Sequence, residues 1–192
     1  MFARLQEQFD QIDLMTYDLS GPWPGFRTWY NAGLFSPREK MNATEPYPSV
    51  SAMVDQYVKA GVARGKLGIG VAFYGYVWDG VDGPRQPQSG GKVDDGVDYR
   101  VIMDTLYRKD RYHWDSAAHA PWLSVRSLTP SERKFVSYDD ERLAAEKIRY
   151  VRTTGLGGAI IWELGAGYRP QLPHGRRDGM LQAVKRALLR TH

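Results

Sequence analysis

Short apolar runs alternate along the chain with stretches in which apolar residues recur every three or four positions. Three apolar runs are typical of buried strands: 11–17, 66–73 and 157–163. Three stretches have helical spacing: 50–60, a segment that starts at Asp139 or Asp140 and ends at Gly155, and 178–189. Strands that alternate with helices in this way predict parallel β–α–β units.

The pattern changes between residues 76 and 136. Glycine, proline, aspartate and scattered aromatic residues replace the regular spacing there, with one helix predicted near 97–107 and weak strands after it. We therefore predict an α+β insertion subdomain at 76–136, between two barrel-like segments at 1–75 and 137–192. Residues 1–9 resemble the end of a helix.

Composition narrows the class of protein. The chain has 192 residues, 26 Lys and Arg against 22 Asp and Glu, and 42% apolar residues, which is typical of a globular protein. The net charge of +4 is spread along the chain, so neither a nucleic acid nor a membrane surface is expected as partner. The sequence holds no cysteine, and its four histidines lack metal-ligand spacing, so no metal and no cofactor is expected. The first residues also lack the pattern of a signal peptide.

Aromatic residues gather at the predicted strand ends. The chain has 12 Tyr, 6 Trp and 6 Phe, which either anchor the core and loops or line a cleft with flat stacking surfaces. In a β/α barrel, active groups lie at the carboxyl ends of the strands. Those ends carry Tyr17 and Asp18, then Tyr74 and Tyr76, then Trp162 followed by Glu163. Rings beside carboxylates suit a carbohydrate, and the pattern favours a sugar-processing barrel.

Four segments carry a resemblance to a known family. They are Asp13 to Trp23 with Met15, Tyr17 and Asp18, then Lys66 to Gly75, Phe135 to Asp140, and Gly155 to Glu163 with Trp162. In this order they resemble the sixth strand, the seventh strand, the return from an α+β insertion and the eighth strand of glycoside hydrolase family 18, the chitinases. The resemblance implies an α/β fold, namely a partial (β/α)8 TIM barrel of strands six to eight with an α+β insertion between the last two strands.

The family's general acid has no counterpart in this sequence. In the family the acid is the glutamate of an Asp-x-x-Asp-x-Asp-x-Glu motif on the fourth strand. The stretch 95–100 imitates that motif, but Tyr99 and Arg100 stand where the motif continues, so we interpret it as unrelated. The resemblance then implies the carboxyl-terminal half of a barrel. Its expected partner is the missing amino-terminal half or a second copy of the chain.

The resemblance also implies roles for single residues. Tyr17 and Asp18 would be catalytic, with the Tyr17 hydroxyl bound to the N-acetyl oxygen of the substrate. Five residues would bind substrate: Met15, Trp23, Tyr74, Tyr76 and Trp162. Tyr76 stands where many members have arginine, and Glu163 is interpreted as structural. The insertion aromatics form either a cleft wall or a subdomain core: Tyr107, Tyr112, Trp114 and Trp122.

The function implied is that of a chitinase-like glycoside hydrolase. It would act on β-1,4-linked N-acetylglucosamine polymers by substrate-assisted retaining hydrolysis, and the resemblance implies an extracellular setting. Peptidoglycan and N-linked glycans stay open as substrates. Two alternatives remain, a lectin-like protein that binds chitin or chitooligosaccharides without catalysis, and a half barrel that assembles with itself.

Overall fold

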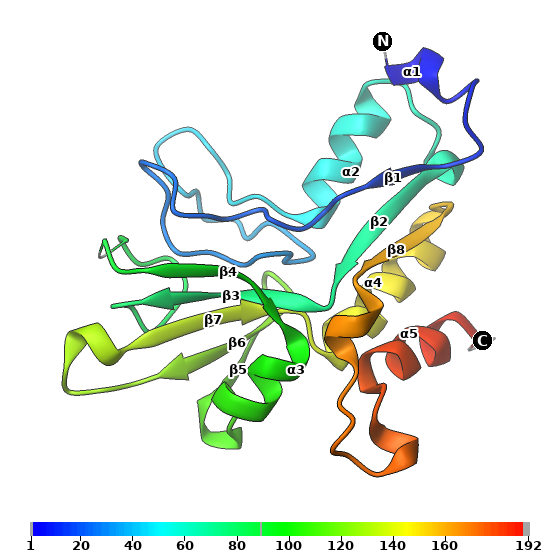
Figure 1. Cartoon of the computed structure of the whole chain (residues 1–192). Helices are drawn as coiled ribbons and strands as arrows, with labels where there is room; N and C mark the ends of the chain where they lie inside the picture. Colours follow the sequence, from blue (N-terminus) through cyan, green and yellow to red (C-terminus); the bar gives the residue numbers. More distant parts are fainter. Residues whose placement is uncertain (1, 89, 190–192) are drawn as a thin grey trace.

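Two sheets dominate the computed structural model, which describes residues 2–88 and 90–189 (Figure 1). The first is a parallel sheet of three strands in the order β1 (Ile12–Leu14), β2 (Leu67–Ala72) and β8 (Gly158–Trp162). β2 is paired with both neighbours in parallel register. The three strands lie within the three predicted apolar runs, so the prediction of parallel β–α–β units is confirmed.

Helices precede, connect and follow these strands. They are α1 (Phe2–Leu5), α2 (Val50–Lys59), α4 (Glu141–Thr154) and α5 (Gly179–Leu189). α2 begins after Ser49, whose hydroxyl accepts the Ala52 N–H, and α4 ends at Gly155 in the left-handed conformation that glycine permits. Of the predicted segment 1–9, whose first residue lies outside the described part, only α1 is helical. Within the described residues, no helix has both the length and the apolar content that crossing a membrane requires.

The second sheet is antiparallel and lies between β2 and α4 in the sequence. Its five strands, in the order β4-β3-β7-β6-β5, are β3 (Tyr74–Asp79), β4 (Val93–Asp98), β5 (Tyr112–Asp115), β6 (Ala120–Val125) and β7 (Lys134–Tyr138). Short 3₁₀ turns cover Arg64–Lys66, Lys109–Arg111, Pro130–Glu132, Leu164–Gly167 and His174–Arg176. Within the described residues neither sheet closes on itself. The domain boundaries at 75/76 and 136/137 stay a prediction.

The helix predicted near 97–107 starts two residues too early. Residues 97 and 98 belong to β4, because Asp98 pairs with Tyr74 of β3. The helical part comprises α3 (Tyr99–Val101) and a π-helical turn over Ile102–Leu106. Pairing with a strand some twenty residues away has overridden the local helical pattern.

The strand predicted at 11–17 is also shorter than expected. The ladder with β2 stops at Leu14, and the Thr16 N–H turns back to the Leu14 carbonyl at 2.8 Å. This tight turn breaks the alternation of faces, so Met15 is 68% exposed whereas Tyr17 is buried. Met15 and Tyr17, which would share one face of a regular strand, therefore lie in different environments.

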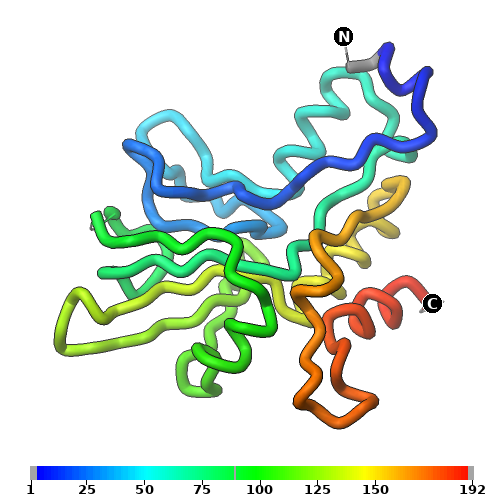
Figure 2. The backbone as a smooth tube through the Cα atoms, viewed as in Figure 1, coloured from blue at the N-terminus to red at the C-terminus, as the bar shows by residue number. Residues whose placement is uncertain are grey.

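A single residue, Phe73, joins the two sheets. Its N–H donates to the Trp162 carbonyl at 2.7 Å, and its carbonyl accepts the Tyr99 N–H at 2.8 Å. In Figure 2 the long loops of 15–49 lie beside the strands of the antiparallel sheet, and Trp29 and Tyr47 of these loops pack in one buried cluster with the sheet. The carboxyl end of the parallel sheet therefore opens directly onto the beginning of β3.

Asp140 caps α4 and also binds Tyr112 of β5, so its buried carboxyl group provides a test of the contact between α4 and β5. Its Oδ1 accepts the Leu143 N–H at 2.8 Å, and its Oδ2 accepts the Tyr112 hydroxyl at 3.0 Å. Burial raises the pKa of Asp140 from the ordinary 3.8 to about 6, against the lowering effect of these two hydrogen bonds. The folded state therefore binds this proton more tightly than the unfolded state. The free energy of unfolding should fall by about 2–3 kcal/mol as the pH rises from the ordinary pKa of 3.8 through the folded-state pKa of about 6.

Asp140→Asn should flatten that fall, because an amide can cap the helix but does not titrate. The measurement is urea unfolding of both proteins at pH 4 and pH 7, with Asp110→Asn, at an exposed aspartate, as the matched control. An equal pH dependence in wild type and Asp140→Asn would contradict the prediction.

Candidate functional site

The strand ends meet around a cavity of about 390 Å³. Five residues from the predicted strand ends line it: Asp18, Tyr74, Tyr76, Trp162 and Glu163. Because the carboxyl ends of parallel strands lie at one edge of a sheet, residues far apart in the sequence gather there. The structure thus brings together four of the seven residues predicted as site residues, and Glu163 with them. Their role in a site stays a prediction.

Two tyrosine hydroxyls converge on one carboxylate oxygen. The hydroxyls of Tyr74 and Tyr76 donate to Asp18 Oδ1 at 2.6 Å and 3.1 Å. The two tyrosines are two positions apart on β3, so their side chains lie on the same face of the sheet. Tyr17 packs edge-on against Tyr74, with ring centroids 5.9 Å apart.

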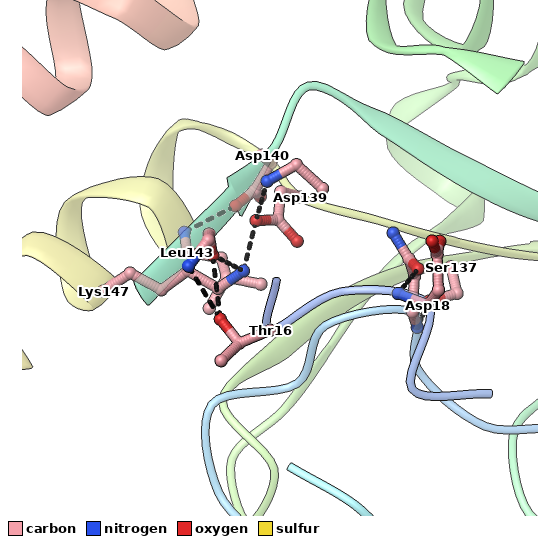
Figure 3. A network of polar contacts seen from close by, with 10 residues as sticks. Thr16, Asp18, Ser137, Asp139, Asp140, Leu143 and Lys147 are labelled. Carbon is pink, nitrogen blue, oxygen red and sulfur yellow. Dashed lines mark hydrogen bonds and ion pairs between the residues drawn. The ribbon is translucent and has the colours of Figure 1, made fainter. Parts of the chain in front are cut away.

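Asp18 is held in an uncommon backbone conformation. Its φ of 57° lies in the left-handed region, which aspartate tolerates better than most residues do. Its N–H donates to Asn31 Oδ1 at 2.8 Å, and the Asn31 N–H donates to the Ser137 hydroxyl at 2.6 Å (Figure 3). The backbone of Asp18 is therefore connected through Asn31 to β7 of the antiparallel sheet.

The surroundings raise the pKa values of the three tyrosines near Asp18. Burial, followed by the hydrogen bond and the negative charge of Asp18, raises the pKa of Tyr74 well above its ordinary value. Burial and Asp18 also raise the pKa of Tyr76 and of Tyr17. All three phenols thus stay hydrogen-bond donors at neutral pH.

Trp162 gives the cavity a flat apolar wall. The side chain is 58% exposed at the end of β8, and a cis peptide bond joins it to Glu163. Its backbone is fixed, because the Trp162 carbonyl accepts the Phe73 N–H. An exposed indole on a fixed backbone is a surface on which a planar or sugar ring can stack.

Two carboxylates of the cavity were missed by the sequence reasoning. Asp95 and Asp98 of β4 also line it, although the sequence suggested only an unrelated imitation of an acidic motif there. Asp98 reaches the cavity because it pairs with Tyr74, and Arg100 Nη2 binds it at 2.9 Å. Only the pairing of β4 with β3 brings these two residues to the cavity, and the local spacing of residues does not reveal that pairing. With Asp18 and Glu163, these residues make the cavity acidic.

Three predicted residues lie outside the cavity lining. Tyr17 is buried behind Tyr74, and Met15 points to the surface. Trp23 is 43% exposed and lines a separate hollow with Phe26, their ring centroids 5.1 Å apart. The loop from 20 to 25 thus places Trp23 apart from the strand ends.

The insertion aromatics pack mainly with their neighbours. Trp122 stacks on His113 with centroids 4.3 Å apart, and the Arg142 guanidinium lies 3.6 Å from the centre of the Trp114 ring. Tyr107 and Tyr112 make an edge contact at 6.3 Å. None of the four lines the 390 Å³ cavity, and the partner of Trp114 belongs to α4, outside residues 76–136.

The cavity chemistry favours a polyhydroxylated ligand. In residues 2–88 and 90–189, no three His, Asp or Glu side chains gather closely enough to hold a metal ion. Carboxylates accept hydroxyl protons, phenols donate to oxygens, and an indole covers an apolar ring face. An acidic surrounding also stabilises a positive charge that develops on a bound molecule.

Known proteins resemble this chain over most of its length. The family model for glycosyl hydrolases family 18 matches residues 2–167. Chitinase A1 of Niallia circulans is 32% identical over an alignment of 176 positions, which covers 84% of this chain and 24% of that protein.

Solved structures also resemble this chain over nearly its whole length. A family 18 N-acetylglucosaminidase from Paenibacillus barengoltzii is 28% identical, with a TM-score of 0.74 over 97% of this chain and 51% of that chain. Human YKL-39, described as a pseudo-chitinase that retains chitooligosaccharide binding, shares the fold at 22% identity, with a TM-score of 0.80 over 98% of this chain and 53% of that chain. The chain thus spans about half the length of these solved chains and a quarter of the chitinase.

The convergence on Asp18 predicts unequal effects of removing the two hydroxyls. Tyr74→Phe should lower the free energy of unfolding by about 1 kcal/mol, because the short hydrogen bond from the buried Tyr74 to the exposed carboxylate of Asp18 is lost. Tyr76→Phe removes the longer bond and should cost less. Urea unfolding measures both.

A double-mutant cycle supplies the control. In the Asp18→Asn background, which keeps a residue that tolerates the left-handed conformation, the cost of Tyr74→Phe should shrink. An unchanged cost would mean that the tyrosine acts by packing and not through Asp18.

Proposed function

This chain belongs to glycosyl hydrolase family 18, and we propose that it forms part of a site for β-1,4-linked N-acetylglucosamine oligosaccharides. Its fold is the TIM-barrel-type α/β fold of that family. The observation that carries the proposal is the convergence of Tyr74 and Tyr76 on Asp18 beside the exposed indole of Trp162. This arrangement offers both the polar contacts and the stacking surface that a sugar ring requires.

The residues at the strand ends have distinct proposed roles. Trp162 stacks under the sugar on one side of the bond to be cleaved. Tyr17 packs against Tyr74 outside the lining of the cavity, and its hydroxyl is proposed to reach the N-acetyl oxygen from there. Asp18 orients the acetamido group, while the hydroxyls of Tyr74 and Tyr76 hold its carboxylate in place. Met15 and Trp23 lie outside the 390 Å³ cavity, and we propose that they contact more distant parts of a longer oligosaccharide.

We propose that hydrolysis retains the configuration of the sugar. The N-acetyl carbonyl oxygen forms a bond to the anomeric carbon as the bond to the leaving oxygen breaks, and a general acid gives that oxygen a proton. The oxazolinium intermediate carries a positive charge, which the acidic cavity stabilises. Water then opens the intermediate and restores the acetamido group.

The general acid and the rest of the barrel are proposed to come from outside this sequence. The Asp-x-x-Asp-x-Asp-x-Glu motif does not occur in these 192 residues. Among the residues that the structure describes, β1 and β8 are the two edges of the parallel sheet, so their outer hydrogen-bonding groups are open to further strands. We propose that an amino-terminal barrel half occupies these edges, with a second copy of the chain as the other possible occupant. The family resemblance alone supports an extracellular setting.

The absence of that motif also favours a second candidate, binding without cleavage. A chain with the aromatic and carboxylate groups but no acid would act like a lectin for chitooligosaccharides. This is the kind of activity that the YKL-39 description gives to that protein. The two candidates differ in turnover and not in binding.

Binding depends on Trp162 in both candidates. Trp162→Ala should weaken the affinity for an N-acetylglucosamine tetramer at least about tenfold, because the stacking surface is lost. Isothermal titration calorimetry of the purified chain measures this, with Trp122→Phe as the control that should bind normally. Equal affinity of wild type and Trp162→Ala would sink the proposed site.

Turnover by the chain alone tests the proposal that the general acid comes from outside this sequence. The chain alone should release no fluorophore from a labelled N-acetylglucosamine oligomer, since it lacks the acid motif. Turnover that disappears in Tyr17→Phe would contradict this expectation and would point to another acid, such as Glu163 or a group from a second copy.

A further inference from the structure

A buried ion pair lies behind the cavity. Lys147 of α4 and Asp139, just before that helix, approach to 2.5 Å, and their side chains are 0% and 1% exposed (Figure 3). Burial raises the pKa of Asp139 and lowers that of Lys147, so each partner needs the other to remain charged. Buried ion pairs of this kind contribute little net stability compared with apolar residues of the same size. Stability alone therefore does not explain the pair.

Both partners also bind the backbone of β2. Asp139 Oδ2 accepts the Ala72 N–H at 3.2 Å, and Lys147 Nζ donates to the Gly70 carbonyl at 3.2 Å. All of these contacts of the aspartate use Oδ2. The ion pair thus binds the backbone of the last residues of β2 from the side of α4.

Thr16 holds the same strand end from the other side. The ladder between β1 and β2 ends at the pair Leu14 and Ile69. Beyond it the Thr16 hydroxyl accepts the Gly70 N–H at 2.8 Å and donates to the Gly70 carbonyl at 3.3 Å. The carbonyl of Gly70 is therefore shared by Thr16 and Lys147, which links two segments through one peptide group.

These contacts lie just before the site residues on both segments. Thr16 is two positions before Asp18, and Ala72 is two positions before Tyr74. We propose that Asp139 and Lys147 are positioning residues, which lock the end of β2 against Thr16 and so set the meeting of the Tyr74 and Tyr76 hydroxyls with Asp18. The placement of the tyrosines is independent of any ligand, whereas its effect on sugar affinity rests on the proposed function.

The test removes the pair without leaving a buried charge. Asp139→Asn with Lys147→Met keeps the volume nearly constant and deletes both charges. Thr16→Val, an uncharged change of similar shape, is the second variant and loosens the same strand end from the other side. The matched control is Asp79→Asn with Lys134→Met, which removes the Lys134–Asp79 ion pair between β3 and β7.

The primary readout is carbon NMR of protein labelled at the tyrosine Cζ atoms. Tyr74→Phe and Tyr76→Phe assign the two resonances, whose positions report the hydrogen bonds to Asp18. In the folded double variant and in Thr16→Val both resonances should move or broaden, while the control keeps them in place. Affinity for the N-acetylglucosamine tetramer should fall about tenfold in the same two variants.

The outcomes distinguish the two proposals. Wild-type tyrosine resonances in either folded variant would overturn the positioning role and leave the ion pair as a packing feature. If the double variant does not fold, Thr16→Val decides in the same way. If the wild-type chain binds no tetramer, the proposed function fails, while the NMR comparison still decides whether the ion pair positions the tyrosines.

Discussion

The short connection between the two sheets constrains the rest of this structure, because Phe73 is the single residue between β2 and β3. A parallel strand usually ends in a loop that is free to move. Here β3 starts one residue after β2 ends, so the strand backbone fixes the direction of the Tyr74 and Tyr76 side chains. The edge of the parallel sheet and the beginning of the antiparallel sheet therefore form one rigid wall of the cavity.

Such a junction leaves backbone groups without strand partners, and polar side chains replace them. The Thr16 hydroxyl accepts the Gly70 N–H and donates to the Gly70 carbonyl, and Asp139 accepts the Ala72 N–H. Burying a lysine and an aspartate for this purpose is costly unless their remaining bonds are satisfied. The position of the ion pair, directly behind the residues that meet Asp18, gives a physical reason for keeping it.

Much of the fold could be predicted from the sequence, because its parallel strands and helices have strong local patterns. The runs at 66–73 and 157–163 contain β2 and β8, and the caps at Ser49 and Gly155 mark helix ends. Asp18, Tyr74, Tyr76 and Trp162 could be grouped for the same reason, since they follow such strands.

Long-range pairing accounts for what local patterns could not provide. Asp95 and Asp98 reach the cavity only through the pairing of β4 with β3. Similarly, the turn at Thr16, which separates Met15 from Tyr17, depends on a hydroxyl that finds its partner 54 positions away. Neither contact leaves a periodic trace in the sequence.

The central claim is that Trp162 and the tyrosines around Asp18 form a single sugar-binding surface. Its most direct measurement is an NMR titration of the purified chain with an N-acetylglucosamine tetramer, following the Trp162 indole N–H and the amides of Asp18 and Tyr74. We expect saturable shifts of all three signals with one common affinity. Signals of Trp162 and Tyr74 that stay in place at saturating tetramer would contradict the claim.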